Sequence, residues 1–582
     1  MKNFRLFIAF IFAGAILFSC GEDDKGESNA AQEKVKNEQI KDNTFNLALS
    51  EKVQGFDPIK VVDGFSFQVL GQIYEGLLKF NEKDLTIEPS IAASWEVSED
   101  GLTYTFKIKK GVSFHDNDCF EGGKERVLTS KDVKYSLERA CSNVEGNYAY
   151  NLFKNSIVGA VQFHENETIN DVEGIKIIDD YTVQISLLKP SANFLNSLAV
   201  INTSIVPKEA FENKSDCFVG TGPFMLDKHD EEGNKTLLKR NENYHLKDKE
   251  GNKLPYLDKV VVHYVSNSQE KLEMFEAGKL DVIVDLPSAS IKTVVENQIS
   301  DFEAKPPKYV LGRYPELVTS YLQLNTMVEP LNNVKVRQAI AMCINKTKIV
   351  DVVLNGEAYG PANNGIVPPA IKGYDYESIV GLEYNVEKAK QLLTEAGYKN
   401  GEGFPTLKLY NSGKESQALR VGLEIQKEFR TSLNINVEIV SVSFAEKMKA
   451  EAKGDAHMSV AAWLADFPTP DNFLSITYGA TVPSSMEESS FPNGSRYVNK
   501  EFDKLYEEAI STIDEAKRNE ICLKAEQLMI NDAPIVPLWY NENYRLLQSN
   551  ISGYQPSIMH IQNLIYVKKI PKLKNTQDKE VE

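Results

Sequence analysis

The apolar positions in the first half of the chain follow the two-residue spacing of β-strands. Between residues 103 and 110, Tyr104, Phe106 and Ile108 are apolar and most of the residues between them are polar. Successive side chains of a strand point to opposite faces, so this pattern predicts a half-buried strand. Residues 44–50 show the same pattern, and residues 175–187 predict a hairpin. A helix over 269–278 and a buried strand over 280–286 are also expected.

The second half alternates between helical and strand patterns. Asparagines at 333 and 385 are suited to cap helices that run to about residues 345 and 397. The pattern then predicts strand 406–410, helix 415–430, strand 435–441, helix 444–452 and strand 457–463. Repeated strand–helix–strand units are typical of a parallel sheet covered by helices. Ligands of such sheets bind beyond the carboxyl ends of strands, which directs attention to the residues after 463.

Residues 463–474 read WLADFPTPDNFL. Two prolines within three residues prevent a continuing strand or an immediate helix. The segment therefore predicts a stiff loop that holds Asp466 between Trp463 and Phe467, where a carboxylate can pair with a ligand ammonium. The alternative is structural: Asp466 forms a turn and Asp471 caps a helix.

The N-terminus has the features of a lipoprotein signal. Lys2 and Arg5 precede an apolar run over residues 6–18, which is too short to span a bilayer comfortably. We therefore expect a signal peptide over residues 1–19. The run ends in LFSC and resembles a lipobox, which predicts lipidation of Cys20; the alternative is an ordinary signal with an incidental cysteine. Residues 20–43 lack aromatics and predict a flexible tether.

The remaining length is too great for one core, so two or three domains are expected. A hydrophobic content of 42% excludes a disordered body, and the net charge of −18 argues against nucleic acid and anionic membrane surfaces as partners. No phosphate loop, dinucleotide loop, nucleophile elbow or zinc spacing is present, so neither a cofactor nor a metal is expected, and no catalytic residue is assigned. A secreted glycoside hydrolase stays a remote alternative, because acidic residues always offer a carboxylate pair.

Five cysteines follow Cys20, and none shows CxxC spacing. An extracytoplasmic location permits disulfides. Cys119, Cys141 and Cys217 lie in the same half of the chain and can supply one, but the sequence does not pair them. Cys343 lies in an apolar helical pattern and is expected to be a buried thiol.

Several segments, taken in order, resemble the family-5 extracellular solute-binding proteins, which include the oligopeptide- and dipeptide-binding subunits of ABC importers. The similarity covers about residues 45–565. The segments are 55–58 (GFDP), 74–77 (YEGL), 93–95 (ASW), 104–106 (YTF), 114–116 (FHD), 129–137 (TSKDVKYSL), 219–224 (VGTGPF), 332–346, 385–397 and 463–474.

The resemblance implies an α/β, two-lobed periplasmic-binding-protein-like fold of the class II type, with an extra subdomain in the first lobe. Lobe I would comprise residues 44–305 and 530–570, with the subdomain at about 75–206. Lobe II would comprise residues 306–529, and a polar tail would follow at 571–582. The hinge would lie where the chain crosses between lobes, near residues 305 and 530.

The resemblance also assigns roles to residues. Asp466 matches the aspartate that pairs with the α-ammonium of a peptide, and Trp463 and Phe467 would flank the ligand. Ala462 and Leu464 would offer backbone groups to an extended peptide. Phe65 falls near the segment that supplies strand-like contacts from the other lobe.

The sequence departs from the family pattern in two places. Dipeptide-selective members have an arginine for the ligand carboxylate, whereas residues 409–414 here read LYNSGK, in which Lys414 is the available cation. The second departure is an insertion over residues 117–128, which contains Cys119 and is expected to form a surface loop.

The resemblance implies a protein that is not an enzyme. It would be a monomer in the cell envelope, lipid-anchored on the periplasmic side or at the outer-membrane surface. It would deliver peptides to an ABC importer with its permease and ATPase. An oligosaccharide or a nickel chelate is the alternative solute, but Asp466 favours a ligand with a free amine, since a buried carboxylate without a cation is costly.

Overall fold

The computed structural model describes residues 43–570, except 83, 124–125, 167, 213–216, 285–306, 357, 414–416 and 556–561. The predicted signal peptide, Cys20, the tether, the hinge residue near 305, Lys414 and the tail lie outside the described residues. Within the described ranges, no helix is both long enough and apolar enough to cross a membrane.

The main feature is a mixed 11-stranded sheet. Ten of its strands form one path, and β13 (Gly360–Pro361) pairs with β17 beside it. In order the path is β15 (Val437–Val442), β14 (Leu407–Ser412), β16 (Met458–Leu464), β12 (Tyr309–Leu324), β17 (Ile535–Gln548), β11 (Val282–Ile283), β1 (Thr44–Leu49), β10 (Lys259–Tyr264), β9 (Lys235–Arg240) and β8 (Phe224–Asp230).

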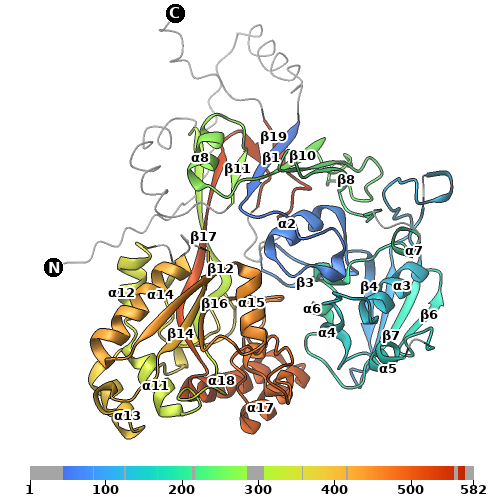
Figure 1. Ribbon diagram of the computed structural model, residues 1–582. Coiled ribbons are helices and arrows are strands. Elements are labelled where there is room, and N and C mark those ends of the chain that lie inside the picture. Colours follow the sequence, from blue (N-terminus) through green and yellow to red (C-terminus); the bar gives the residue numbers. More distant parts are fainter. Residues whose placement is uncertain are drawn as a thin grey trace, which may run out of the picture. The chain divides into compact units, whose positions relative to one another are not determined.

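Two long strands, β12 and β17, pair antiparallel in the middle of this sheet and join its two parts (Figure 1). Strand β12 begins in the core around Phe275, with Tyr309, and ends in another core with Leu322 and Leu324. Strand β17 makes the same passage in the opposite direction. The register between them shifts between Pro315 and Thr319, where the ladder is irregular. The change from one core to the other therefore lies inside these strands.

Three smaller sheets accompany the large one. The four-stranded sheet, β4 (Ala92–Val97), β5 (Thr103–Ile108), β7 (Thr182–Ser186) and β6 (Ile175–Asp179), forms the centre of its own apolar core. The two-stranded sheets are β2 (Leu78–Phe80) with β3 (Ile87–Pro89), and β18 (Ile551–Ser552) with β19 (Lys568–Lys569).

Helices surround the sheets. Those of the first half are α2 (Gly64–Ile73), α3 (Ser130–Cys141), α4 (Tyr150–Phe153), α5 (Ala160–Glu165), α6 (Phe194–Ser197), α7 (Lys208–Glu212) and α8 (Ser268–Glu276). Those of the second half are α11 (Val334–Cys343), α12 (Lys346–Lys348), α13 (Val386–Glu395), α14 (Gln417–Glu428), α15 (Phe444–Ala452), α16 (Pro470–Leu474), α17 (Lys500–Ser511) and α18 (Glu515–Asp532).

Local sequence signals explain many of these elements. The side chains of Asn333 and Asn385 accept backbone N–H groups at the starts of α11 and α13, as expected. In β5, Tyr104, Phe106 and Ile108 are buried, which confirms the alternation. Strand β14 runs parallel to β15 and β16, in agreement with the predicted parallel units. The predicted strand 280–286 is shorter, with only two residues in β11.

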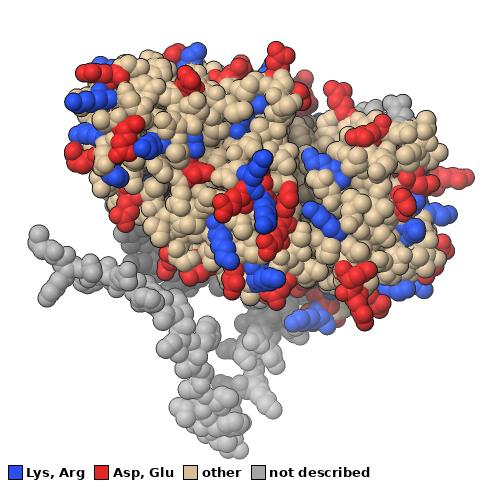
Figure 2. Space-filling view, turned by 90° about the horizontal axis from the view of Figure 1, so that it is seen from below, with Lys and Arg blue, Asp and Glu red and all other residues tan. Residues whose placement is uncertain are grey.

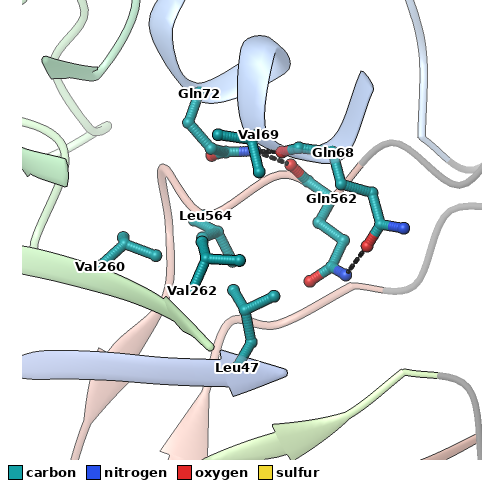
Figure 3. Close-up of a pocket in the computed structure, with 8 residues that line it drawn as sticks. All are labelled: Leu47, Gln68, Val69, Gln72, Val260, Val262, Gln562 and Leu564. Carbon is teal, nitrogen blue, oxygen red and sulfur yellow. Dashed lines mark hydrogen bonds between the residues drawn. The ribbon is translucent and has the colours of Figure 1, made fainter. Parts of the chain in front are cut away.

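A small cavity lies between β1, β10 and α2 (Figure 3). The Gln72 side chain donates to the Gln68 and Gln562 carbonyls, and the Gln562 amide donates to the Gln68 side chain. The cavity has room for about one water molecule, which is too little for a solute. None of the predicted site residues lines it, so it is not the functional site.

Charges are mixed on the surface. Figure 2 shows one face on which acidic and basic side chains are interspersed among other residues. That face offers no large basic area of the kind that a polyanion needs.

Candidate functional site

The edge of β16 is open where the predicted site begins. Strand β16 pairs with β12 along its whole length, but it pairs with β14 only at Met458 and Ser459. The Ala465 N–H donates to the Leu317 carbonyl of β12 at 2.9 Å. Because hydrogen-bonding residues alternate in an antiparallel ladder, the backbone groups of Ala462 and Leu464 point away from β12. Among the described strands none pairs with them there.

One buried side chain organises the loop that follows β16. Asn472 accepts the indole N–H of Trp463 at 2.9 Å and the backbone N–H of Asp466 at 3.1 Å, and its amide donates to an Asp466 carboxylate oxygen at 3.3 Å. Helix α16 begins at Pro470, where the missing N–H of a proline costs nothing. The loop therefore turns back on itself and holds the carboxylate of Asp466 in place.

The sequence analysis did not identify Asn472 as part of the site. The motif predicted a helix start here, and the only available signal for Asn472 was an amide side chain two residues after the second proline. Asn472 is only 4% exposed, so its three hydrogen bonds are made away from solvent, where an unpaired amide would be costly.

The carboxylate of Asp466 is accessible to solvent, although dense protein surrounds it. Desolvation raises the pKa of its carboxyl, and the hydrogen bond from Asn472 opposes this effect. No lysine or arginine of the described residues forms an ion pair with it. An accessible carboxylate with an elevated pKa and no cation partner is suited to receive a cationic group.

Tyr506 of α17 faces the same region. Burial raises the pKa of its phenol, and the nearby charges of Asp471 and Asp466 raise it further. Its ring lies 4.6 Å from that of Tyr478 between centroids. Tyr506 was not predicted, because nothing in the local sequence pattern of α17 relates it to a loop 40 residues earlier.

Asp471 does not cap a helix, which corrects the structural alternative stated for it. The N-cap of α16 is Thr469, and Asp471 lies inside the helix with 1% exposure. Its carboxylate accepts a hydrogen bond from the Asn193 amide. Burial raises the pKa of the Asp471 carboxyl, and the Arg518 charge opposes this. Next to Asn193, the Ala192 N–H donates to the Ile510 carbonyl at 3.1 Å.

The other predicted residues are placed as follows. Ala462 is exposed, Trp463 and Leu464 are half-buried, and Phe467 is 8% exposed. Phe65 lies in the first turn of α2. It is near β16, since a Cβ placed on Gly64 would lie 3.5 Å from the Leu464 Cδ2. In the part of the chain that the structure describes, no group of three or more His, Cys, Asp or Glu residues is arranged to hold a metal.

The comparisons with known proteins agree with this geometry. The model of the bacterial extracellular solute-binding proteins, family 5 Middle, matches residues 86–485, more than half of the chain. The chain belongs to this family. Its members are binding proteins and not enzymes, and they work outside the cytoplasm.

Two curated relatives cover nearly the whole chain. Heme-binding protein A of Haemophilus influenzae is 29% identical over 562 residues, which are 94% of this chain and 95% of the relative. The dipeptide-binding protein of Escherichia coli is 28% identical over 517 residues, which are 86% of this chain and 90% of the relative.

A solved structure has the same fold. It is the ABC transporter-associated periplasmic binding protein DppA from Helicobacter pylori in complex with the peptide STSA, with a TM-score of 0.75 and 28% identity. The match covers 91% of this chain and 98% of that one. The expected two-lobed α/β fold is thereby confirmed.

Proposed function

We propose that this family-5 protein captures peptides with a free amino terminus and delivers them to an ABC importer. One observation carries the proposal: the Asp466 carboxylate is accessible, has no cation partner among the described residues, and lies directly after the open edge of β16. A peptide offers an ammonium for the carboxylate and main-chain groups for the edge. No other common solute combines the two features.

The edge of β16 supports an added strand. The outward backbone groups of Ala462 and Leu464 are spaced two residues apart, which matches the repeat of an extended peptide. Main-chain hydrogen bonds are common to all peptides, so this mode tolerates many side chains. Trp463 is half-buried beside the edge and is proposed to flank the ligand; Phe467 is proposed to support the loop from beneath, since it is nearly buried.

The other candidate solutes lack a group for Asp466. Haem, suggested by the name of one relative, carries carboxylates and no ammonium, and an oligosaccharide carries no charge. Each would leave the carboxylate desolvated without a counter-ion, which is costly. A nickel chelate would meet no metal-binding cluster in the described residues. These ligands are therefore disfavoured, and catalysis is not proposed.

Capture is proposed to favour a closed form of the two lobes. Ala192 and Asn193 belong to the proposed lobe I subdomain. They contact α17 and α16 of proposed lobe II, and these contacts hold their segment next to the Asp466 loop. The irregular register of β12 and β17 between Pro315 and Thr319 is the proposed site of bending. A ligand that contacts both sides would shift the equilibrium toward closure.

Anchoring is part of the proposal. Residues 1–19 would be removed as a signal peptide, Cys20 would carry the lipid, and the body would act as a monomer on its tether. Labelling with a radioactive fatty acid tests the anchor: the protein should incorporate label, and C20S should not. Equal labelling of the two would remove the lipid from the proposal.

Mass spectrometry of co-purified ligands tests the function. The mature protein, purified without denaturant and then denatured, should release short peptides with free amino termini. The variant D466N, made in the same host, should release fewer. Recovery of sugars, haem or a nickel chelate in stoichiometric amounts would refute the proposal.

A further inference from the structure

The inserted segment 117–128 is anchored in the protein and is not a free surface loop. Phe120 is 7% exposed and Leu128 is fully buried in the subdomain core. Arg126 forms ion pairs with Asp132 at 2.6 Å and with Glu209 at 2.9 Å. Arg126 thus ties the C-terminal part of the insertion to α3 and α7, and Phe120 packs its earlier part into the core.

The insertion places Cys119 on the same apolar core as Cys217. Both thiols are half-buried and pack against the same apolar core. The chain segments that carry them are joined nearby, four residues before Cys119 and three residues after Cys217, because the His115 N–H donates to the Gly220 carbonyl at 2.9 Å. The His115 ring nitrogen Nε2 also lies 2.9 Å from the Gly222 carbonyl oxygen.

The two thiols therefore lie on one apolar core, on segments that a backbone hydrogen bond joins close to both cysteines. Burial raises the pKa of the Cys119 thiol to about 11, and both the charge of Cys217 and a hydrogen bond between the two thiols contribute to the rise. The remaining cysteines of the body, Cys141, Cys343 and Cys522, are buried, and none of the groups that shift their pKa values is a thiol.

We propose that Cys119 and Cys217 form a disulfide once the protein has left the cytoplasm, and that this bond staples the insertion to the turn at 219–222. The proposal rests on the extracytoplasmic location of the family, where disulfides persist. In the reaction, one cysteine thiolate attacks a protein or small-molecule disulfide and releases one thiol. The second cysteine attacks the mixed disulfide and releases the other thiol, so the oxidant gains the two electrons and two protons that the cysteines lose.

The staple would act on a turn that is packed tightly against α2. A Cβ on Gly220 would overlap the Ile73 carbonyl at the end of that helix, so the turn has no room to shift alone. Beside it, the Thr221 hydroxyl donates to the Glu75 carboxylate at 2.8 Å. Because α2 begins next to Leu464 of β16, the staple would stabilise the element that faces the candidate site from the other lobe.

Peptide mapping of the exported, full-length protein tests the pairing. The protein is denatured and alkylated with and without a reductant, and digested. Without reductant, Cys141, Cys343 and Cys522 should be alkylated, whereas the peptides of Cys119 and Cys217 should appear as one cross-linked species that reduction separates. Alkylation of Cys119 and Cys217 without reductant would overturn the proposal, and so would a link of either to Cys141.

Thermal unfolding adds a readout for the role of the bond. A reductant should lower the midpoint of the wild-type protein by several degrees and leave that of C119S/C217S unchanged, since a cross-link stabilises by restricting the unfolded chain. An equal response of both proteins would refute the stapling role. If the double variant does not fold, the mapping of the wild-type protein still decides the pairing. Neither measurement needs a ligand, so their outcome is separate from that of the proposed peptide binding.

Discussion

Replacing Asp466 by asparagine tests the proposed ligand charge pair. Asparagine keeps the shape of the side chain and one oxygen for the hydrogen bond from Asn472, but it removes the charge. The truncation of one partner of a buried, hydrogen-bonded charge pair costs about 2–5 kcal/mol. Here the unliganded carboxylate is accessible and partly hydrated, which places the loss near the lower end. We expect about 2–3 kcal/mol, or an affinity for free-amine peptides lower by about 30- to 150-fold.

The assay is calorimetric titration of the wild-type protein and of D466N. The ligand is one peptide recovered from the protein, synthesised once with a free amino terminus and once with an acetylated amino terminus. Acetylation should weaken binding to the wild-type protein strongly and binding to D466N little, because the variant has no charge for the ammonium. The four affinities form a double-mutant cycle, which isolates the pair from other effects of each change. Equal unfolding midpoints of the two ligand-free proteins serve as the folding control.

The pH dependence follows from the same pair. The pKa of the Asp466 carboxyl is raised in the free protein, and a bound ammonium would lower it. Affinity for a free-amine peptide should therefore fall as the pH drops through the raised pKa, and D466N should lose this dependence. If acetylation weakens binding to both proteins equally, Asp466 does not bind the ammonium and the reasoning fails.

Three further predictions concern stability and closure. N472A should lower the free energy of unfolding by about 2 kcal/mol in denaturant titrations, because two N–H groups lose their acceptor; an unchanged free energy would count against this role. The pKa of Glu526 is raised to about 7 by burial. The stabilising contribution of the protonated carboxyl should be complete below about pH 4.5 and should be lost as the pH rises to about 7, which lowers the free energy of unfolding by about 3 kcal/mol. E526Q should therefore flatten the dependence of the unfolding free energy on pH in that range. If E526Q leaves this dependence unchanged, Glu526 does not cause it. N193A should weaken peptide binding by about 1–2 kcal/mol through loss of the donor to Asp471, and should also lower the ligand-free melting midpoint, because the buried carboxylate loses this donor; undiminished affinity would show that the contact does not stabilise the closed form.

The local elements were predictable because their signals lie within a few residues. The alternation in β5 follows from side chains that point to opposite faces. The starts of α11 and α13 follow from asparagines that accept the first free N–H groups. Likewise, the two prolines after Asp466 were sufficient to predict a stiff loop at the end of β16.

Other expectations were wrong or incomplete because they depend on contacts between distant segments. Phe65 lies in α2, which Asp63 caps by accepting the Ser66 N–H, and its expected place near the ligand stays a prediction. Asp471 has the composition of a cap, yet it is buried against Asn193, which lies 278 residues away. The lobe boundaries near residues 305 and 530 stay a prediction; the change from one core to the other lies within β12 and β17.

By itself the sequence determined the classes of element, the family and the residue type at the centre of the site. These depend on local periodicity, on capping and on a motif of twelve residues. The tertiary structure decided which edge of β16 is open, that Asn472 holds Asp466, and that Cys119 and Cys217 pack against one core. Each of these depends on how segments far apart in the chain pack together. Short-range pattern does not encode that packing, because it is selected by burial and hydrogen bonding over the whole fold.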